Sequence, residues 1–198
     1  MSAGHHYVTL QSDAVFIKRS IRYPEAFGEV FDRHWVAVYR YCRSRVGGDG
    51  EGVAAATFRL AFERRVGYDT QSNDALPWLL GIATNLIRNH LRAQSRGERA
   101  VERLDVSPTV DHADAAMDRA EAALLGPALA EALDGISPDD RDTLLLMAWN
   151  DLSYPEVAEA LEIPVGTVRS RVSRARIRLR TSLAELGYTR APSILPLE

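Results

Sequence analysis

The sequence of 198 residues has little cysteine and no recognisable motif for catalysis or metal binding. Its only cysteine is Cys42, so no disulfide bond can form within the chain. It has no Gly-rich phosphate loop, no zinc-ligand spacing and no nucleophile in a recognisable catalytic setting. We therefore expect no catalytic residue, no cofactor and no metal site. His5 and His6 are interpreted as part of a disordered start rather than a metal site, and Cys42 as a buried, inert thiol rather than a redox group.

Long apolar runs are also absent. No stretch of eighteen apolar residues occurs, so no membrane-spanning helix is expected. The N-terminal residues lack the charged start and apolar centre of a signal peptide. Together with the single cysteine, these absences predict a cytoplasmic protein without membrane insertion.

The alternation of apolar and polar residues that marks β-strands is almost missing, whereas apolar residues recur at helical spacing. Helices are expected at about residues 13–20, 24–46, 53–65, 77–93, 119–133, 138–149, 154–161 and 167–186, with Ser137 of "SPDD" as the cap of the helix at 138–149. Between them, the acidic segment around Pro108 is poor in large apolar groups, which favours a linker. We predict an all-α fold of two small helical domains joined by a flexible acidic linker. The expected bounds are a disordered tail at 1–11, a first domain at 12–96, the linker at 97–118, a second domain at 119–187 and a tail at 188–198.

Positive charge is unevenly placed along a chain whose net charge is −3. Residues 122–165 hold one basic and nine acidic groups, whereas residues 166–180 hold six arginines and no acid. Within the arginine-rich segment, apolar residues follow one helical face: Val168, Val172, Ala175, Leu179 and Leu183. An apolar stripe with a cationic outer face predicts a helix that docks on its own domain and faces phosphates. The alternative is an arginine face that is merely solvated.

A short helix precedes this arginine-rich one. Ser153 and Glu156 have the spacing of a capping box, and a tight connection then leads into the basic helix, which predicts a helix-turn-helix. The N-terminal end of such a recognition helix contacts base edges, whereas the remaining arginines contact phosphates. The expected base contacts are Arg169, Ser170 and Ser173, and the expected phosphate contacts include Arg171, Arg174 and Arg176.

The segment "LSYPEVAEALEIPVGTVRSRVSRARIRLR" resembles the C-terminal DNA-binding domain of the extracytoplasmic-function (ECF) sigma factors of bacterial RNA polymerase. The match is most specific at "GTVRSRVSRAR". The resemblance implies that the last helix binds the −35 promoter element, with Arg169, Ser170 and Ser173 at the base-reading positions. Glu162 stands where a glycine is common in the family. A left-handed backbone there would cost a non-glycine residue about 1–2 kcal/mol.

The N-terminal half extends the resemblance. "PWLLGIATNLIRNHLR" is similar to the family's promoter-melting helix, in which Asn85 and Asn89 share a face with Arg88 and Arg92. The resemblance implies that this helix and the preceding loop hold an unpaired −10 base; the loop residues are Asp69, Thr70, Gln71, Ser72 and Asn73. A cationic groove beside such a pocket is a reasonable site for single-stranded DNA, and a solvated helix face is the alternative. Trp78 is expected in the core rather than stacked on DNA.

The segment "GVAAATF" at residues 52–58 lies where the family binds core RNA polymerase. The resemblance implies polymerase contacts from Val53, Ala54, Thr57 and Phe58. Gly52, Ala55 and Ala56 replace the polar groups usual in the family, which predicts an altered contact. The acidic linker either lies in a nucleic-acid channel of the polymerase or is a solvated tether.

These features predict a sigma factor without catalytic activity of its own. The expected partners are promoter DNA, core RNA polymerase and an anti-sigma factor. One alternative is a helix-turn-helix regulator that binds duplex DNA without polymerase. Another is an interaction protein whose acidic helices hold a partner while the arginine face is ordinary surface; such a protein would show no salt-sensitive DNA affinity.

Overall fold

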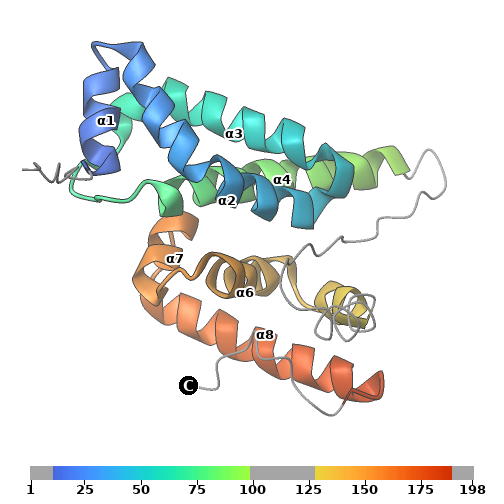
Figure 1. Cartoon of the computed structure of the whole chain (residues 1–198). Helices are drawn as coiled ribbons and strands as arrows, with labels where there is room; N and C mark the ends of the chain where they lie inside the picture. Colours follow the sequence, from blue (N-terminus) through green and yellow to red (C-terminus); the bar gives the residue numbers. More distant parts are fainter. Residues whose placement is uncertain (1–10, 99–127, 189–198) are drawn as a thin grey trace, which may run out of the picture.

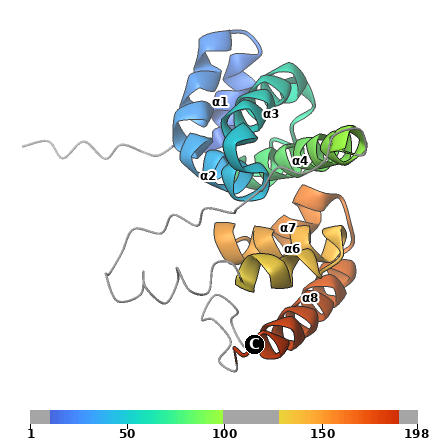
Figure 2. The same ribbon diagram turned by 90° about the vertical axis from the view of Figure 1, so that its right-hand side faces the viewer.

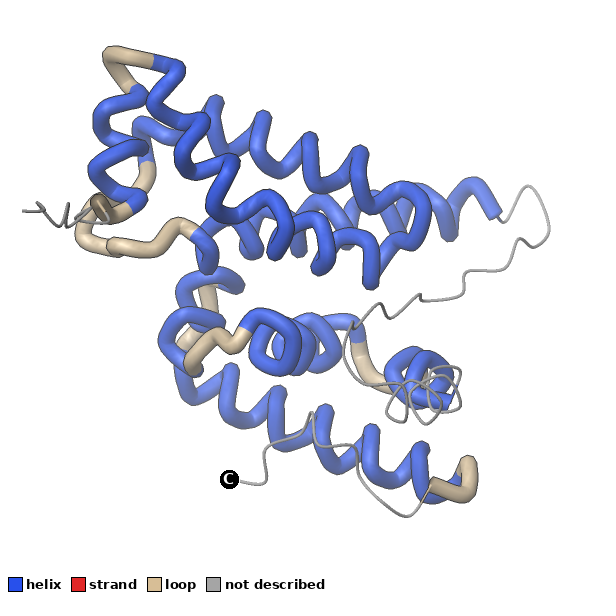
Figure 3. The backbone as a smooth tube through the Cα atoms, in the orientation of Figure 1, coloured by secondary structure: helices blue, strands red, loops and turns tan. Residues whose placement is uncertain are grey.

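The computed structural model describes residues 11–98 and 128–188, and every regular element within those ranges is helical (Figure 3). The first range contains α1 (Asp13–Ser20), α2 (Gly28–Val46), α3 (Gly50–Arg64) and α4 (Leu76–Glu98), with short 3₁₀ turns η1 (Pro24–Phe27), η2 (Gly47–Asp49) and η3 (Arg65–Gly67). The second contains helical residues 128–134, followed by α6 (Pro138–Asn150), α7 (Tyr154–Leu161) and α8 (Val165–Glu185). The all-α prediction is confirmed.

The helix bounds differ from the predicted ones in a few places. The second predicted helix divides into η1 and α2, because Pro24 opens a 3₁₀ turn rather than the helix itself. The third begins at Gly50, three residues earlier than predicted, and α4 continues to Glu98. The predicted linker therefore begins inside α4, and its remainder from residue 99 lies outside the described residues. So do residues 1–10, 119–127 and 189–198.

The N-terminal helices form a bundle in which α2 packs on both α3 and α4 (Figures 1 and 2). Tyr41 of α2 is almost fully buried, and its hydroxyl lies 2.8 Å from Oγ1 of Thr84 in α4. Thr84 donates its own proton to the carbonyl oxygen of Leu80. Tyr41 therefore donates to Thr84, and this buried pair is fully satisfied. Burial raises the pKa of Tyr41 to about 12, so the hydroxyl stays neutral.

The C-terminal helices begin at the predicted caps. The side chain of Ser137 accepts a hydrogen bond from the Asp140 amide at the start of α6. Ser153 and Glu156 form the predicted capping box at the start of α7. Helix α8 packs on α6 and α7 through its predicted apolar stripe, and all five stripe residues are buried. A capped short helix and a buried stripe together fix the direction of α8.

The two helical groups pack against each other, with α7 lying on α4 (Figure 1). One apolar core continues across the contact and includes Leu80 of α4 and Val157 of α7. At Gly81 the two backbones approach so closely that a Cβ atom would lie 2.3 Å from the carbonyl oxygen of Ala160. Only glycine fits there without movement of one group relative to the other.

Candidate nucleic-acid interface

The turn between α7 and α8 is built around Glu162. This residue adopts the left-handed conformation, with φ 54° and ψ 43°, although it is not a glycine. Its amide donates to the last carbonyls of α7, and the amide of Ile163 donates to Ala158 O at 3.0 Å. The connection therefore has the backbone geometry usually given to glycine, held by hydrogen bonds that end α7.

The first turns of α8 present the predicted base-contacting residues to solvent. Arg169, Ser170 and Ser173 are exposed, whereas the neighbouring Val168 and Val172 are buried. Ser170 donates its hydroxyl proton to Thr167 O at 2.9 Å, so its oxygen remains available only as an acceptor. The guanidinium carbon of Arg169 lies 5.9 Å from the ring centroid of Tyr154, within cation–π range. Arg169 is thus beside α7 but open to a ligand.

Two of the predicted phosphate-contacting arginines bind carboxylates of α6. Nη2 of Arg171 lies 2.7 Å from Asp139, and Arg174 forms a two-pronged contact with Asp140 at 2.8 and 3.1 Å. Burial opposes ionisation of Asp140, but the hydrogen bonds from Arg174 and Ser137 outweigh it and lower its pKa. Asp139 and Asp140 therefore engage two of the guanidinium groups for which the sequence predicts phosphate contacts. Arg176 is half-buried, and Arg178 and Arg180 are exposed.

Helix α4 displays the two predicted asparagines but not both of the predicted arginines. Asn85, Asn89 and Arg92 are exposed. Arg88 instead reaches α6, where its Nε lies 2.6 Å from Asp142 and its Nη2 lies 2.8 Å from Asp139.

Asp142 is fully buried and also pairs with Arg45 of α2 at 2.6 Å. Ion pairs thus connect α2, α4 and α6. Asp139 extends the series to α8, because it contacts both Arg88 and Arg171.

The C-terminal part of α4 carries a shallow cationic hollow. It has a volume of about 480 Å³ and is lined by Asn89, Arg92, Ser95 and Arg96. The hydroxyl of Ser95 donates to Arg92 O at 3.1 Å. Two exposed guanidinium groups beside an amide give this hollow the charge and donors that a phosphodiester requires.

The loop before α4 is held by its own side chains. The buried Tyr68 hydroxyl donates to Ser72 O at 3.0 Å and lies 3.2 Å from Asp74 O. The Asp69 side chain accepts from the Gln71 amide, and the Ser72 hydroxyl donates to Asp74 O. Asp69 and Ser72 therefore shape the loop. The other three predicted loop residues are exposed and make no side-chain hydrogen bond to a described residue; they are Thr70, Gln71 and Asn73.

Comparison with known proteins identifies the family. Residues 127–179 match the family model of sigma-70 region 4. The chain is 31% identical over 164 residues to the RNA polymerase sigma factor CarQ of Myxococcus xanthus, covering 82% of this chain and 91% of that protein. It is 30% identical over 164 residues to the ECF RNA polymerase sigma factor SigL of Mycobacterium tuberculosis, covering 81% and 90%. The chain belongs to the extracytoplasmic-function sigma factors.

Solved structures share the fold of this sigma factor. The sigma factor RpoE of Bartonella quintana, solved with the anti-sigma factor NepR, aligns with a TM-score of 0.62 at 24% identity, covering 81% of this chain and 98% of that one. CnrH, solved with the cytosolic domain of CnrY, aligns with a TM-score of 0.63 at 24% identity, covering 87% and 97%.

The residues expected to contact polymerase lie inside this sigma factor. Val53, Ala54, Thr57 and Phe58 are all buried in the core of the N-terminal bundle. The Thr57 hydroxyl donates a hydrogen bond to Val53 O at 2.9 Å. The sequence prediction therefore marked the inward face of α3. In the structure described, the outward face carries other residues: Gly52, Ala55 and Arg59.

Sequence reasoning missed the partners of several site residues in this sigma factor. In the sequence, Asp142 and Arg45 carry no signal beyond their charge, and Tyr68 carries none. The acidic string "SPDDRD" was recognised only as a helix start. The opposite charge of this segment and of the arginine-rich helix, which follows after α7, was the available hint of ion pairs.

The remaining predictions concern groups outside the interface. Cys42 is fully buried, and burial raises its pKa to about 12, as expected for an inert thiol. Trp78 is partly buried on the core, with its ring 4.9 Å from that of Tyr68. His5 and His6 lie outside the described residues. No helix within the described ranges has the length and apolarity to cross a membrane.

Proposed function

We propose that this sigma factor directs core RNA polymerase to specific promoters and supports initiation. In this proposal, α8 reads −35 duplex DNA, while α4 and the loop before it bind the −10 element. The observation that carries the proposal is the division of α8 into a fully buried stripe and an outer face with Arg169, Ser170 and Ser173 exposed at its N-terminal end. Residues 12–96 and 119–187 act as the two functional units.

Base recognition in the −35 element rests on Arg169. A guanidinium group can donate two parallel hydrogen bonds to O6 and N7 of guanine, which gives it the highest specificity of the three exposed groups. Ser170 and Ser173 supply shorter, less selective contacts. Arg176, Arg178 and Arg180 follow along the helix and fit phosphate contacts, which position α8 without specifying sequence.

Arg171 and Arg174 join these phosphate contacts only after leaving Asp139 and Asp140. The exchange replaces one anionic partner by another, so its cost is modest. Each arginine that changes partner displaces a counterion from DNA.

Recognition of the −10 element uses the exposed face of α4. Asn85 and Asn89 offer a donor and an acceptor each to base edges. Arg92 and the hollow at the end of α4 hold the backbone of the unpaired strand. Arg88 contributes once it separates from Asp139 and Asp142, which requires α6 to move away from α4. The loop residues Thr70, Gln71 and Asn73 then contact a displaced base.

Core polymerase binds the region of α3 in this proposal. Val53, Ala54, Thr57 and Phe58 hold that helix in place, and the exposed residues on its outer face make the contact. An anti-sigma factor is a further partner. RpoE and CnrH were each solved with a second protein, and the DNA-binding surfaces proposed here offer the cationic groups that such an inhibitor would cover. The protein acts in the cytoplasm and has no catalytic activity of its own.

Run-off transcription with core RNA polymerase tests the proposal. The template is a promoter selected by the wild-type holoenzyme from a randomised library. We expect Arg169→Ala to weaken −35 preference by about 1–3 kcal/mol at one base position, whereas Arg178→Ala weakens binding uniformly across sequences. Salt-sensitive duplex binding without any initiation by core enzyme would instead identify a polymerase-independent helix-turn-helix regulator.

A further inference from the structure

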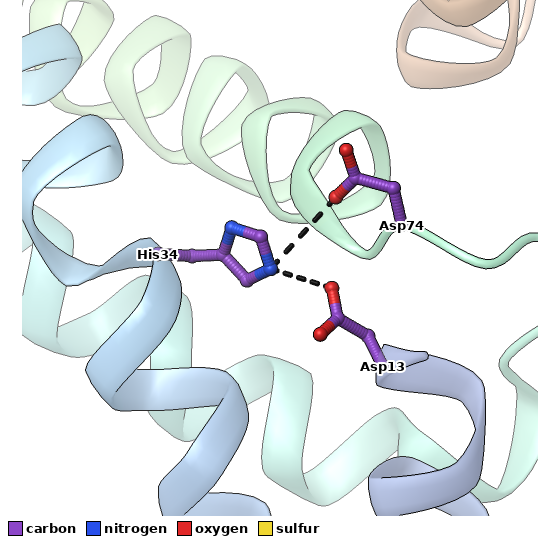
Figure 4. A group of neighbouring side chains, drawn as sticks. All are labelled: Asp13, His34 and Asp74. Atoms are coloured by element: carbon purple, nitrogen blue, oxygen red, sulfur yellow. Dashed lines mark hydrogen bonds and ion pairs between the residues drawn. The ribbon is translucent and has the colours of Figure 1, made fainter. Parts of the chain in front are cut away.

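Asp13, at the start of α1, is buried beside the loop that precedes α4 (Figure 4). Its Oδ1 accepts a hydrogen bond from Arg33 at 2.9 Å. Its Oδ2 accepts from the Ala75 amide at 2.9 Å and lies 2.5 Å from Nε2 of His34. The Asp13 amide donates to Asn73 O at 3.0 Å. One residue of α1 thus binds the loop backbone on both sides of residue 74.

The neighbouring residues complete this attachment. The Asp74 carboxylate accepts from the Leu76 amide at 2.8 Å and so caps the start of α4. Its other contact is with His34, at 3.8 Å. The Tyr68 hydroxyl binds the carbonyl oxygens of Ser72 and Asp74. Side chains or amides of the N-terminal bundle therefore bind the backbone at Ser72, Asn73, Asp74 and Ala75, while the Asn73 side chain remains exposed.

The side chains of Asp13, His34 and Asp74 also have the chemistry of metal ligands. One ligand atom each from Asp13, His34 and Asp74 lies within 4.8 Å of the others. However, both oxygens of Asp13 already have protein donors, and Arg33 places a positive charge on one of them. A cation would have to displace these donors and accept Arg33 as a neighbour. Hydrogen bonding accounts for the cluster more fully than metal coordination does.

We propose that Asp13 is a positioning residue for −10 recognition, because it fixes the backbone from which Asn73 presents its side chain to an unpaired base. The proposal rests on the proposed function of the loop. A loop whose backbone is already ordered loses less entropy when it binds a base, and it presents one arrangement of donors and acceptors. Substitution of Asp13 retains the loop side chains that contact the base, but the loop backbone then holds them in several arrangements rather than one. Discrimination between bases then falls more than DNA binding does.

The test uses holoenzyme reconstituted from core polymerase and the full chain. Initiation rates are measured on four promoters that differ only in the captured −10 base. We expect the ratio of best to worst base to fall about threefold in Asp13→Asn and about tenfold in Asp13→Ala, since an amide retains one acceptor and alanine none. Dependence on the −35 sequence is expected to stay unchanged in both. Asp32→Asn, which removes an exposed carboxylate of α2, is the matched control.

A double-mutant cycle separates positioning from general stability. In the Asn73→Ala background, Asp13→Asn is expected to cause no further loss of base preference, because the side chain that it positions is gone. An equal further loss in that background, or an unchanged ratio in folded Asp13→Asn, overturns the proposal. If Asp13→Ala does not fold, the isosteric asparagine variant still decides the question.

Two further results have separate meanings. If wild-type holoenzyme initiates without any preference at the captured base, the function proposed for the loop fails before Asp13 is considered. Zn²⁺ alone is titrated into the full chain while thermal unfolding is followed. A rise in melting temperature that Asp74→Asn abolishes would replace the positioning role by a metal site. No change with Zn²⁺ is the expected result.

Discussion

Arg88 and Asp142 join the two helical groups through a contact of 2.6 Å between Nε and Oδ2. Asp142 is fully buried, and its second oxygen pairs with Arg45, whose side chain is 5% exposed. The carboxylate therefore lies between two guanidinium groups from different helices. A buried charge of this kind adds stability only while its partners remain, because the desolvation cost of each ion is high.

Loss of Asp142 is expected to be strongly destabilising. Asp142→Asn leaves Arg45 buried without a compensating charge, so the free energy of unfolding should fall by about 3–5 kcal/mol. Urea denaturation followed by circular dichroism measures this change. The control is Asp134→Asn, which alters an acid whose side chain is 79% exposed and should change stability by less than about 0.5 kcal/mol. Equal effects of the two variants would contradict the account of the buried network.

The carboxylates of α6 should weaken DNA binding. In the double variant Asp139→Asn, Asp140→Asn, the arginines Arg171 and Arg174 lose their internal partners and become available to phosphates. We expect tighter binding to duplex DNA at every salt concentration, because neither arginine has to leave a carboxylate, and a log–log salt slope close to that of the wild type, because the same phosphate contacts form in both proteins. Fluorescence anisotropy across a series of KCl concentrations measures both.

The control for that experiment removes the same charge elsewhere. Asp32→Asn combined with Glu51→Gln changes two exposed acids of the N-terminal bundle. It should raise affinity slightly through net charge and leave the salt slope unchanged. An equal gain in affinity in the control would show that net charge alone is responsible.

Replacement of Glu162 by glycine should stabilise the protein. Glu162 has a φ of 54°, which costs a non-glycine residue about 1–2 kcal/mol, and the greater entropy of unfolded glycine offsets part of the gain. The expected net effect of Glu162→Gly is an increase of about 1 kcal/mol in the free energy of unfolding. Glu159→Gly, inside α7, is the matched substitution and should destabilise by about 1 kcal/mol. A loss of stability in both would argue against strain at residue 162.

Stability should decline at low pH partly through Asp13. Burial opposes its ionisation, but the hydrogen bonds from His34, Ala75 and Arg33 lower its pKa below the ordinary value of 3.8. A carboxyl whose pKa is lowered by folding stabilises the protein above the unfolded pKa, and this contribution disappears as pH falls through the folded pKa. The stability of Asp13→Asn should therefore depend less on pH below about 4. If the wild type and Asp13→Asn lose stability in parallel as pH falls, the result would contradict a lowered pKa of Asp13 in the folded protein.

Local signals in the sequence predicted the parts of the fold that depend on local physics. Ser137 and Ser153 precede helices with acids at the right spacing, and both caps form as expected. The stripe from Val168 to Leu183 follows helical periodicity, and it is buried throughout. Such features depend on residues a few positions apart, so one sequence contains all the information that they need.

Contacts between distant segments were not predictable in the same way. The resemblance implied polymerase contacts from Val53 and Phe58, although the helical spacing of both also fits an inward face, because a matching segment does not separate the two faces of its helix. Asp142 resembled a solvated acid, since burial depends on helices far away in the sequence. Gly81 lies inside a helix, where a single sequence gives no reason for a residue without a side chain.

A substitution at Gly81 can be used to measure how much of the protein has α7 packed on α4. An alanine there has the better helix propensity, by about 1 kcal/mol, so α4 itself should tolerate Gly81→Ala. The added methyl group meets the backbone of Ala160, however, and so disfavours only the state in which α7 lies on α4. The substitution thus shifts a conformational equilibrium without altering a DNA-contacting side chain. The change in promoter affinity of Gly81→Ala would report what fraction of the free sigma factor is packed.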